Sequence, residues 1–235
     1  TETYSMNGEQ LAPIAHRGEP VRRTAEKQFY PRVEGGFKKI IRHGDNPTNY
    51  WWEVTNKSGT KYFYGGTPGK GILESSVLKD ADGNIAHWAL VEVRGLNDNF
   101  VSYQHIKVQD TGLKGGTVPG YNLYVDKITY TGHGNEEGKY EVLFTRDREL
   151  GEAKRTDVSI NARYGFKQVT ADLLRKIEVR YNGENIRSYE LTYRQGAFFK
   201  TLLEKITQYD AKGIEFNSHE FEYYDDVKSA EGYTP

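Results

Sequence analysis

The chain repeats one structural unit, in which an aliphatic or aromatic strand, a turn of Gly, Asn or Asp, and a strand carrying Tyr follow one another. The clearest copies lie at residues 51–65, 77–88, 90–105 and 173–193, and a fifth lies at 202–224. Chains that repeat a hairpin usually build a surface or an array. The pattern therefore predicts an all-β, mostly antiparallel sheet of successive hairpins with little helix, arranged as a wall or as a β-sandwich.

Glycines mark the turns of these units. Asn182-Gly183 is the pair best suited to a type I′ hairpin turn, because both positions tolerate positive φ. We expect four turns to depend on glycine: Gly59, Gly83, Gly183 and Gly213. We expect the buried face to be formed by large side chains of the strands: Trp52, Trp88, Leu90, Tyr103, Ile177, Tyr193, Ile206 and Tyr223. On full burial each of these side chains contributes roughly 1.5 to 3 kcal/mol.

The organisation along the chain is uneven. Residues 1–30 have little periodicity and are predicted to be an extended lead-in with at most one short strand, followed by a β-rich domain over 31–235. A punctuated stretch at 109–122 is predicted to be either a loop or a seam between subdomains. Residues 37–42 (FKKIIR) are a candidate edge strand. Residues 170–176 (TADLLRK) form either two turns of helix or, more simply, the entrance to a strand.

Composition excludes several classes of protein. Lys plus Arg total 32 and Asp plus Glu total 33, so no net field attracts nucleic acid or an anionic membrane. No run approaches the roughly 20 apolar residues of a membrane-spanning helix, and the chain is expected to be soluble. With no cysteine, neither disulfides nor thiolate metal sites form. The 18 Tyr and 25 Gly favour short strands over helices. Because the sequence starts at Thr1, we expect it to be an excised part of a longer protein or a processed form.

Local motifs for catalysis, metals and cofactors are not found, and none of the three is predicted. The six His are dispersed and form no metal-binding pair. Residues 80–84 (DADGN) resemble the start of a calcium loop, but Val91 stands where that loop needs a bidentate Glu. Since Asp and Gly also suit a tight turn, a turn is the better interpretation.

Two other functions remain open. A β-rich glycoside hydrolase can draw its two carboxylates from distant strands and so leave no motif. A carbohydrate-binding or adhesion module would use exposed aromatic rings. Strand alternation points Trp51 and Trp52 to opposite faces, so at most one is exposed, and Trp51 is the candidate glycan contact.

The order of several motifs resembles a known family. They are Trp52-Glu53-Val54-Thr55, Gly59-Thr60-Lys61-Tyr62, Asp82-Gly83-Asn84-Ile85, Asn99-Phe100-Val101-Ser102-Tyr103, Arg155-Thr156-Asp157 and Tyr164-Gly165-Phe166. In this order they resemble the SpvB-type amino-terminal domain of plasmid-virulence B proteins and of the B components of Tc insecticidal toxin complexes. The closing residues 203–213 and 221–225 resemble the YD, or RHS-type, hairpin repeats of the same superfamily.

The resemblance implies a structural and non-enzymatic role in a secreted bacterial toxin. In Tc toxins the B and C components form a hollow shell that encloses a cleaved toxic region. The expected partners are therefore other segments or subunits of a toxin complex. No ordered set of ADP-ribosyltransferase motifs is present, so no catalytic residue of those proteins is carried over.

The turn assignment makes one testable prediction. Gly183→Val is expected to lower the melting temperature more than Gly138→Val, because Asn182-Gly183 occupies a tight hairpin turn. Equal melting temperatures of the two variants would contradict it.

Overall fold

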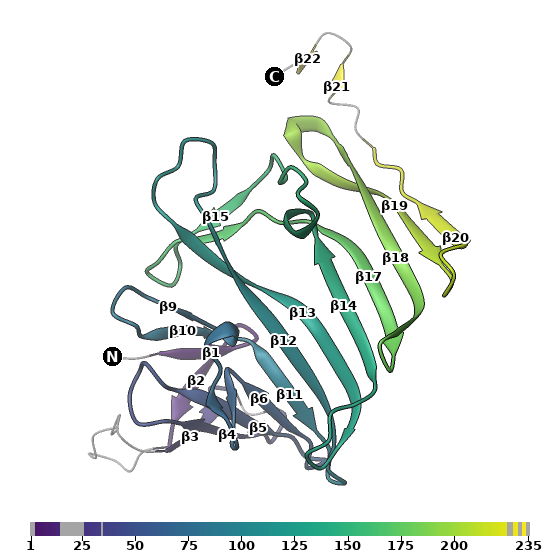
Figure 1. The fold of residues 1–235 in the computed structure, drawn as a ribbon. Helices are drawn as coiled ribbons and strands as arrows, with labels where there is room; N and C mark the ends of the chain where they lie inside the picture. The colour runs from purple at the N-terminus through teal and green to yellow at the C-terminus, as the bar shows by residue number, and fades with distance from the viewer. Residues whose placement is uncertain (1–2, 15–25, 34, 225–227, 230–231, 234–235) are drawn as a thin grey trace.

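A computed structural model describes residues 3–14, 26–33, 35–224, 228–229 and 232–233. Its main feature is a single 16-stranded sheet (Figure 1). Among the described residues no helix has the length and apolar character needed to cross a membrane. The prediction of an all-β, mostly antiparallel chain with little helix is confirmed.

The strands are short at the N-terminus and long in the middle of the chain. They are β1 (Tyr4–Met6), β2 (Glu9–Pro13), β3 (Lys27–Pro31), β4 (Lys39–His43), β5 (Trp51–Thr55), β6 (Lys61–Tyr64), β7 (Gly66–Thr67), β8 (Gly71–Ile72), β9 (Val77–Lys79), β10 (Ile85–Trp88), β11 (Leu90–Arg94), β12 (Asn99–Asp110), β13 (Gly120–His133), β14 (Tyr140–Arg146), β15 (Ser159–Asn161), β16 (Gln168–Thr170), β17 (Leu174–Tyr181), β18 (Glu184–Gln195), β19 (Thr201–Tyr209), β20 (Glu215–Glu220), β21 (Lys228–Ser229) and β22 (Gly232–Tyr233). Three 3₁₀ turns accompany them: η1 (Glu74–Ser76), η2 (Asp147–Leu150) and η3 (Ala197–Phe199).

The sheet follows the chain almost strand by strand. Its order is β1-β2-β3-β4-β5-β6-β11-β12-β13-β14-β17-β18-β19-β20, with β16 beside β13 and β15 beside β16. The five predicted units are all antiparallel hairpins, namely β5–β6, β9–β10, β11–β12, β17–β18 and β19–β20. Local turns therefore account for most of the topology.

The N-terminal segment departs from the prediction. The lead-in was expected to hold at most one strand, but β1, β2 and most of β3 fall within residues 1–30 and continue the main sheet. Leu11 and Phe29 from this segment are buried. Single apolar residues in a polar stretch give too little periodicity to reveal such strands. The pairing of β2 with β3, as at Leu11↔Pro31, also joins residues distant in sequence.

The strand near residues 37–42 is internal rather than an edge. It is β4, which pairs with β3 on one side and β5 on the other. Its Arg42 is 1% exposed, and the guanidinium lies 3.8 Å from the ring centroid of Tyr50. An arginine in a strand suggests an exposed position, but here aromatic rings cover its charge.

The middle of the chain forms the longest hairpin. β12 and β13, of 12 and 14 residues, pair from Asn99↔His133 to Asp110↔Gly120. The stretch at 109–122 holds the turn of this hairpin and its flanking strand ends. Over 170–176 the chain passes from β16 into β17 without a helix, as the strand-entrance interpretation expects.

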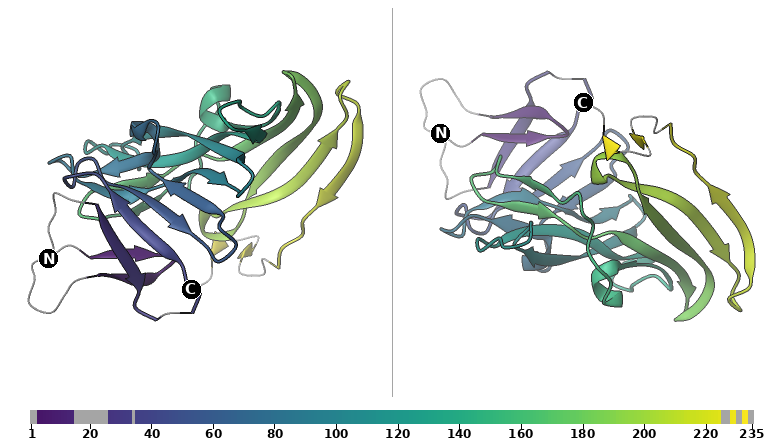
Figure 2. Two further views of the ribbon diagram at one scale, coloured as in Figure 1. Left: turned by 90° about the horizontal axis from the view of Figure 1, so that it is seen from below. Right: turned by 90° about the horizontal axis from the view of Figure 1, so that it is seen from above.

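Both hydrophobic core clusters of the described residues lie in the N-terminal half. One cluster joins β2 to β5 through Leu11, Phe29, Ile40, Trp52 and Val54, with Trp88 of β10 packed against it. By contrast, β14 and β17 to β20 contain no buried apolar side chain among the described residues; their buried residues are Arg146, Ser188 and Thr207. Figure 2 shows β17 to β20 as one curved layer.

Bulges interrupt the ladders of this layer. The register shifts once in each of β14–β17, β17–β18, β18–β19 and β19–β20. A bulge adds one residue to one strand, bends that strand and increases its twist. The curvature of the layer is therefore distributed over its ladders.

The glycine turns include one correction. Gly183 has a φ of 81°, and an added Cβ would meet nothing within 4 Å. At Gly138 a Cβ would overlap the backbone oxygen of Tyr130 and lie 2.9 Å from the Gly132 nitrogen. The expectation that Gly183→Val costs more is therefore wrong, because close backbone approach at Gly138 outweighs the strain of positive φ at Gly183.

The structure predicts the opposite order of stability. Gly183→Ala is expected to lower the free energy of unfolding by about 1–2 kcal/mol, the cost of a left-handed Ala. Gly138→Ala is expected to lower it by about 3 kcal/mol, since backbone atoms must move apart. Urea denaturation measures both values. Gly134→Ala, which also has positive φ and open space, is the control and should match Gly183→Ala.

Candidate functional site

The single-layer part of the sheet has two unlike faces. Cross-strand pairs Val142↔Val179 and Phe144↔Ile177 continue to Tyr189 in β18, and Leu191 pairs with Ile206. Because side chains alternate along a strand, these residues share one face. We call it the apolar face, and its apolar side chains are Tyr130, Tyr140, Val142, Phe144, Ile177, Val179, Tyr189, Leu191 and Ile206. Arg187 and Gln208 lie among them, opposite Val179 and Tyr189.

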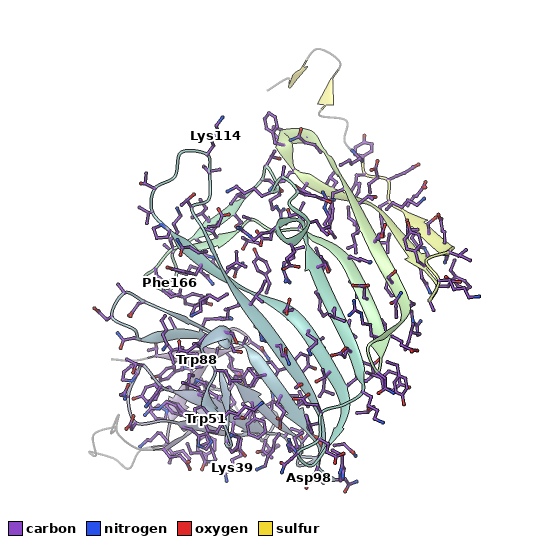
Figure 3. The ribbon with its side chains drawn as sticks, in the orientation of Figure 1. Lys39, Trp51, Trp88, Asp98, Lys114 and Phe166 are labelled. Carbon is purple, nitrogen blue, oxygen red and sulfur yellow. The ribbon has the colours of Figure 1, made fainter. Side chains whose placement is uncertain are left out.

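The apolar face is only half covered. Its nine apolar side chains are all half-buried. The rings of Tyr130 and Tyr140 stack at 5.1 Å, which shields them from water only in part. Figure 3 shows the side chains crowded around Trp51 and Trp88 in the N-terminal half and standing apart along β17 to β19. Exposed apolar surfaces of this kind mark sites of interaction.

The opposite face is charged. Lys127 pairs with Glu141 at 3.1 Å, Glu178 pairs with both Lys176 and Arg180, and Lys205 pairs with Glu220 at 3.5 Å. We call this the charged face. Such partly exposed pairs contribute little to stability but keep a surface hydrated.

The sheet ends at β20 with a free edge. Within the described residues β20 pairs with β19 alone. Ile214 and Phe216 at this edge are 62% and 74% exposed. An edge strand of this kind offers unpaired backbone groups to a further strand.

The predicted core residues fall into three groups. Trp52 is buried, at 6% exposure. Six are half-buried: Trp88, Leu90, Tyr103, Ile177, Tyr193 and Ile206. Tyr223 is 39% exposed, contrary to its assignment to the buried face, because it lies beyond the end of β20, the last strand of the main sheet in the described part of the chain. Its hydroxyl donates to the Leu203 carbonyl at 2.7 Å.

The four predicted turn glycines all have positive φ. The angles are 80° at Gly59, 84° at Gly83, 81° at Gly183 and 78° at Gly213. Residues 80–84 form a turn in which Asp80 accepts hydrogen bonds from the backbone of Asp82 and Asn84. The carboxylate is thus occupied by turn contacts.

Trp51 does not form a sugar platform. It is 8% exposed, and the His43 ring stacks on it at 3.9 Å between centroids. It packs with Phe63 and Val91 in a second small core. Alternation places Trp51 and Trp52 on opposite faces as expected, but both faces are covered in this half of the sheet.

A polar clasp made by Arg155, Thr156 and Asp157 holds the end of the single-layer sheet. Arg155 donates two hydrogen bonds to Asp157, at 2.8 and 2.9 Å. Asp157 accepts from the Thr201 backbone and hydroxyl, at 3.1 and 2.5 Å. Arg155 and these Thr201 contacts hold the pKa of Asp157 well below its usual range. The clasp therefore joins the β14–β17 connection to the start of β19.

A second ion-pair group fixes the same connection near η2. Arg148 donates to Asp172 at 2.9 Å and to Asp110 at 2.8 Å, and Lys154 also donates to Asp110. Hydrogen bonding to Asp172, with a smaller effect of Asp110, raises the pKa of Arg148. These carboxylates are held by cations and stabilise the fold.

A cavity of about 690 Å³ lies between β1, the β5–β6 hairpin and β10. Its aromatic lining residues are Tyr4, Trp52, Tyr64, Trp88 and Tyr164. Tyr164 reaches it from the loop between β15 and β16 and lies 6.1 Å from the His87 ring. Sequence motifs do not reveal this cavity, because it joins segments far apart along the chain.

One known protein family matches more than half of this sequence. The family model described as "Salmonella virulence plasmid 65kDa B protein" matches residues 6–149. The chain belongs to the SpvB family. The match runs from β1 to η2, so this SpvB-family chain carries the family pattern over its cored half and the long β12–β13 hairpin.

Solved structures share the fold over most of the chain. The N-terminal domain of effector protein SpvB from Salmonella typhimurium strain LT2 is 15% identical, with a TM-score of 0.68 over 92% of this chain and 80% of that domain. A TcdB2-TccC3-TEV crystal structure is 14% identical, with a TM-score of 0.65 over 89% of this chain.

A third similar structure is the Photorhabdus luminescens Tc holotoxin pore, at 15% identity and a TM-score of 0.66. The SpvB-family chain spans 12% of the length of each of these two toxin chains. Curated proteins give no match. At these identities the structural matches establish the fold, which extends past the family match into the single-layer sheet.

The clasp gives a pH-dependent prediction. Asp157→Asn is expected to lower the free energy of unfolding at pH 7 by about 2 kcal/mol, as expected for hydrogen bonds to a charged group. Since the folded pKa of Asp157 lies below its unfolded value, the stabilisation is complete above about pH 4 and declines as the pH falls.

The difference between wild type and variant should therefore narrow below about pH 4, measured by urea denaturation. Asp98→Asn, at a side chain 69% exposed, serves as the control and should change little at any pH. A difference for Asp157→Asn that stays constant from pH 7 to pH 2.5 would contradict the assigned role.

Proposed function

We propose that this SpvB-family chain is a non-enzymatic wall segment of a secreted bacterial toxin assembly. Its apolar face would lie against an enclosed polypeptide, and its β20 edge would pair with the next strand of the wall. The observation that carries the proposal is the single-layer sheet, in which β14 and β17 to β20 bury no apolar side chain among the described residues.

The two faces suit a wall better than a self-contained domain. A sheet inside a domain buries its apolar face against a second layer, and a free sheet in water is polar on both faces. Here one face is charged and the other is apolar and half exposed. Covering the apolar face gains roughly 25 cal/mol for each Å² removed from water, so contact with a less ordered chain is favourable.

The similar structures support this assignment. Their titles name an effector protein and Tc toxin complexes, and two of them extend far beyond the matched region. A longer relative with the same fold supports continuation of the sheet past β20. Partners are accordingly other segments or subunits of a toxin complex, with no nucleic acid and no membrane contact by the chain itself.

The carboxylates that bind cations favour structure over hydrolysis. Asp110, Asp157 and Asp172 are each bound by Arg or Lys at 2.8 to 2.9 Å. A glycoside hydrolase needs one carboxyl with a raised pKa beside an ionised one. The pKa values of Asp110 and Asp157 are instead lowered: at Asp110 burial is the largest effect and raises it, but Lys154, Gly112 and Arg148 together outweigh burial. Burial raises the pKa of Asp147, near Asp172, but Asp147 is 0% exposed and accepts hydrogen bonds from two backbone amides, so a sugar does not reach its carboxyl group.

The absence of cysteine permits a direct test with single labels. Leu191 and Glu190 are neighbours in β18 on the apolar and charged faces respectively. Leu191→Cys and Glu190→Cys are prepared in the isolated chain and in the complete toxin assembly, and their rates of reaction with a thiol reagent are measured. We expect assembly to slow Leu191→Cys at least tenfold, because an enclosed chain covers it, and to change Glu190→Cys less than twofold.

Cross-linking from the same positions identifies what covers the face. A photo-reactive group at position 191 should attach to the enclosed polypeptide, whereas one at 190 should not. Equal protection of the two positions, or protection of 190 alone, would contradict the proposed orientation of the wall.

A further inference from the structure

The cavity beside β1 is built from uncharged side chains. Among the described residues that line it there is no Asp, Glu, Lys or Arg. Burial lowers the pKa of His87, so its ring is neutral at pH 7. A charged ligand entering this space would lose its hydration without gaining a counter-charge. The cavity therefore selects for neutral ligands.

Aromatic rings form one wall of the cavity. Trp52 and Trp88 meet edge to face with centroids 5.8 Å apart, and Tyr4 lies 4.9 Å from Trp52 and 5.9 Å from Trp88. The indole nitrogen of Trp88 donates to the Tyr50 carbonyl, which fixes this ring. Flat, fixed rings offer an apolar surface at little cost in side-chain entropy.

Polar groups without protein partners share the space. Within the described residues the His87 ring, the Tyr64 hydroxyl and the Ser5 hydroxyl make no hydrogen bond. The side-chain Nδ2 of Asn84 donates to Asp80, which leaves the side-chain Oδ1 of Asn84 as an acceptor. A purely apolar ligand would desolvate these groups without replacing their bonds to water.

A fitting ligand must combine an apolar surface with several neutral donors and acceptors. We propose that this cavity is a binding site for a neutral sugar, whose C–H face packs on the aromatic wall and whose hydroxyls pair with His87, Asn84 and Tyr64. Its volume lies within the range of roughly 300–1,000 Å³ typical of small-ligand sites. The site is separate from the apolar face and is independent of the wall function.

Three sugars built on one ring test the requirement for neutrality. N-acetylglucosamine is neutral, glucosamine is a cation and glucuronate is an anion at pH 7. Saturation-transfer NMR on the intact chain measures each of them, together with glucose, galactose and mannose. We expect at least one neutral sugar to bind, and glucosamine and glucuronate to bind at least tenfold more weakly than that sugar.

A matched pair of tyrosine variants locates the site. Tyr164, 45% exposed, lines the cavity, and Tyr181, 40% exposed, lies outside it against Tyr140. Tyr164→Ala is expected to weaken binding at least tenfold and Tyr181→Ala less than twofold. His87→Gln, which keeps a neutral polar group of smaller size, gives a second test if Tyr164→Ala proves unstable in thermal melting.

Several results would overturn the proposal. They are the absence of binding by every neutral sugar at 50 mM (about 100-fold above a weak 0.5 mM affinity), equal binding of the charged sugars, and equal losses in the two tyrosine variants. Binding of the tripeptide Gly-Trp-Gly in place of the sugars would assign the cavity to a protein segment and would also overturn it.

Discussion

The antiparallel backbone ladder is the interaction on which the C-terminal half depends. Among the described residues, β14 and β17 to β20 contain no apolar side chain that is fully buried. Ladder hydrogen bonds and facing side-chain pairs must therefore maintain the sheet. This explains why its connections are almost all hairpins, since a hairpin places both strands of a ladder together without a second layer.

The cored N-terminal half supplies the fixed end of that ladder. The first strands pack through the buried side chains of Trp52, Ile40 and Phe29. The long β12–β13 hairpin connects these strands to the single-layer sheet. At the far side, the clasp ties the β14–β17 connection to Thr201. The N-terminal strands are thus stabilised by an apolar core and the C-terminal strands mainly by polar contacts. The surfaces available to partners lie on the C-terminal strands.

Local sequence predicts the hairpins but not which other segments pack against them. Alternation and the Asn182-Gly183 turn predict β17–β18 because both features lie within a few residues. Alternation also puts Trp51 and Trp52 on opposite faces, but burial of Trp51 depends on His43 in another strand. The cavity likewise needs Tyr4 beside Trp88, and the clash at Gly138 depends on Tyr130. The motif Arg155-Thr156-Asp157 helps to identify the family, while its contact with Thr201 is a matter of tertiary structure.

The bulges allow the shape of the sheet to vary independently of its chemistry. Each register shift, as between Thr192 and Tyr193 in the β18–β19 ladder, places an extra residue in one strand without reversing the faces of the remainder. Loss or gain of one such residue would flatten or tighten the arc there and leave the apolar and charged rows in place. The curvature of this sheet is therefore open to change by single-codon insertions and deletions, one strand at a time.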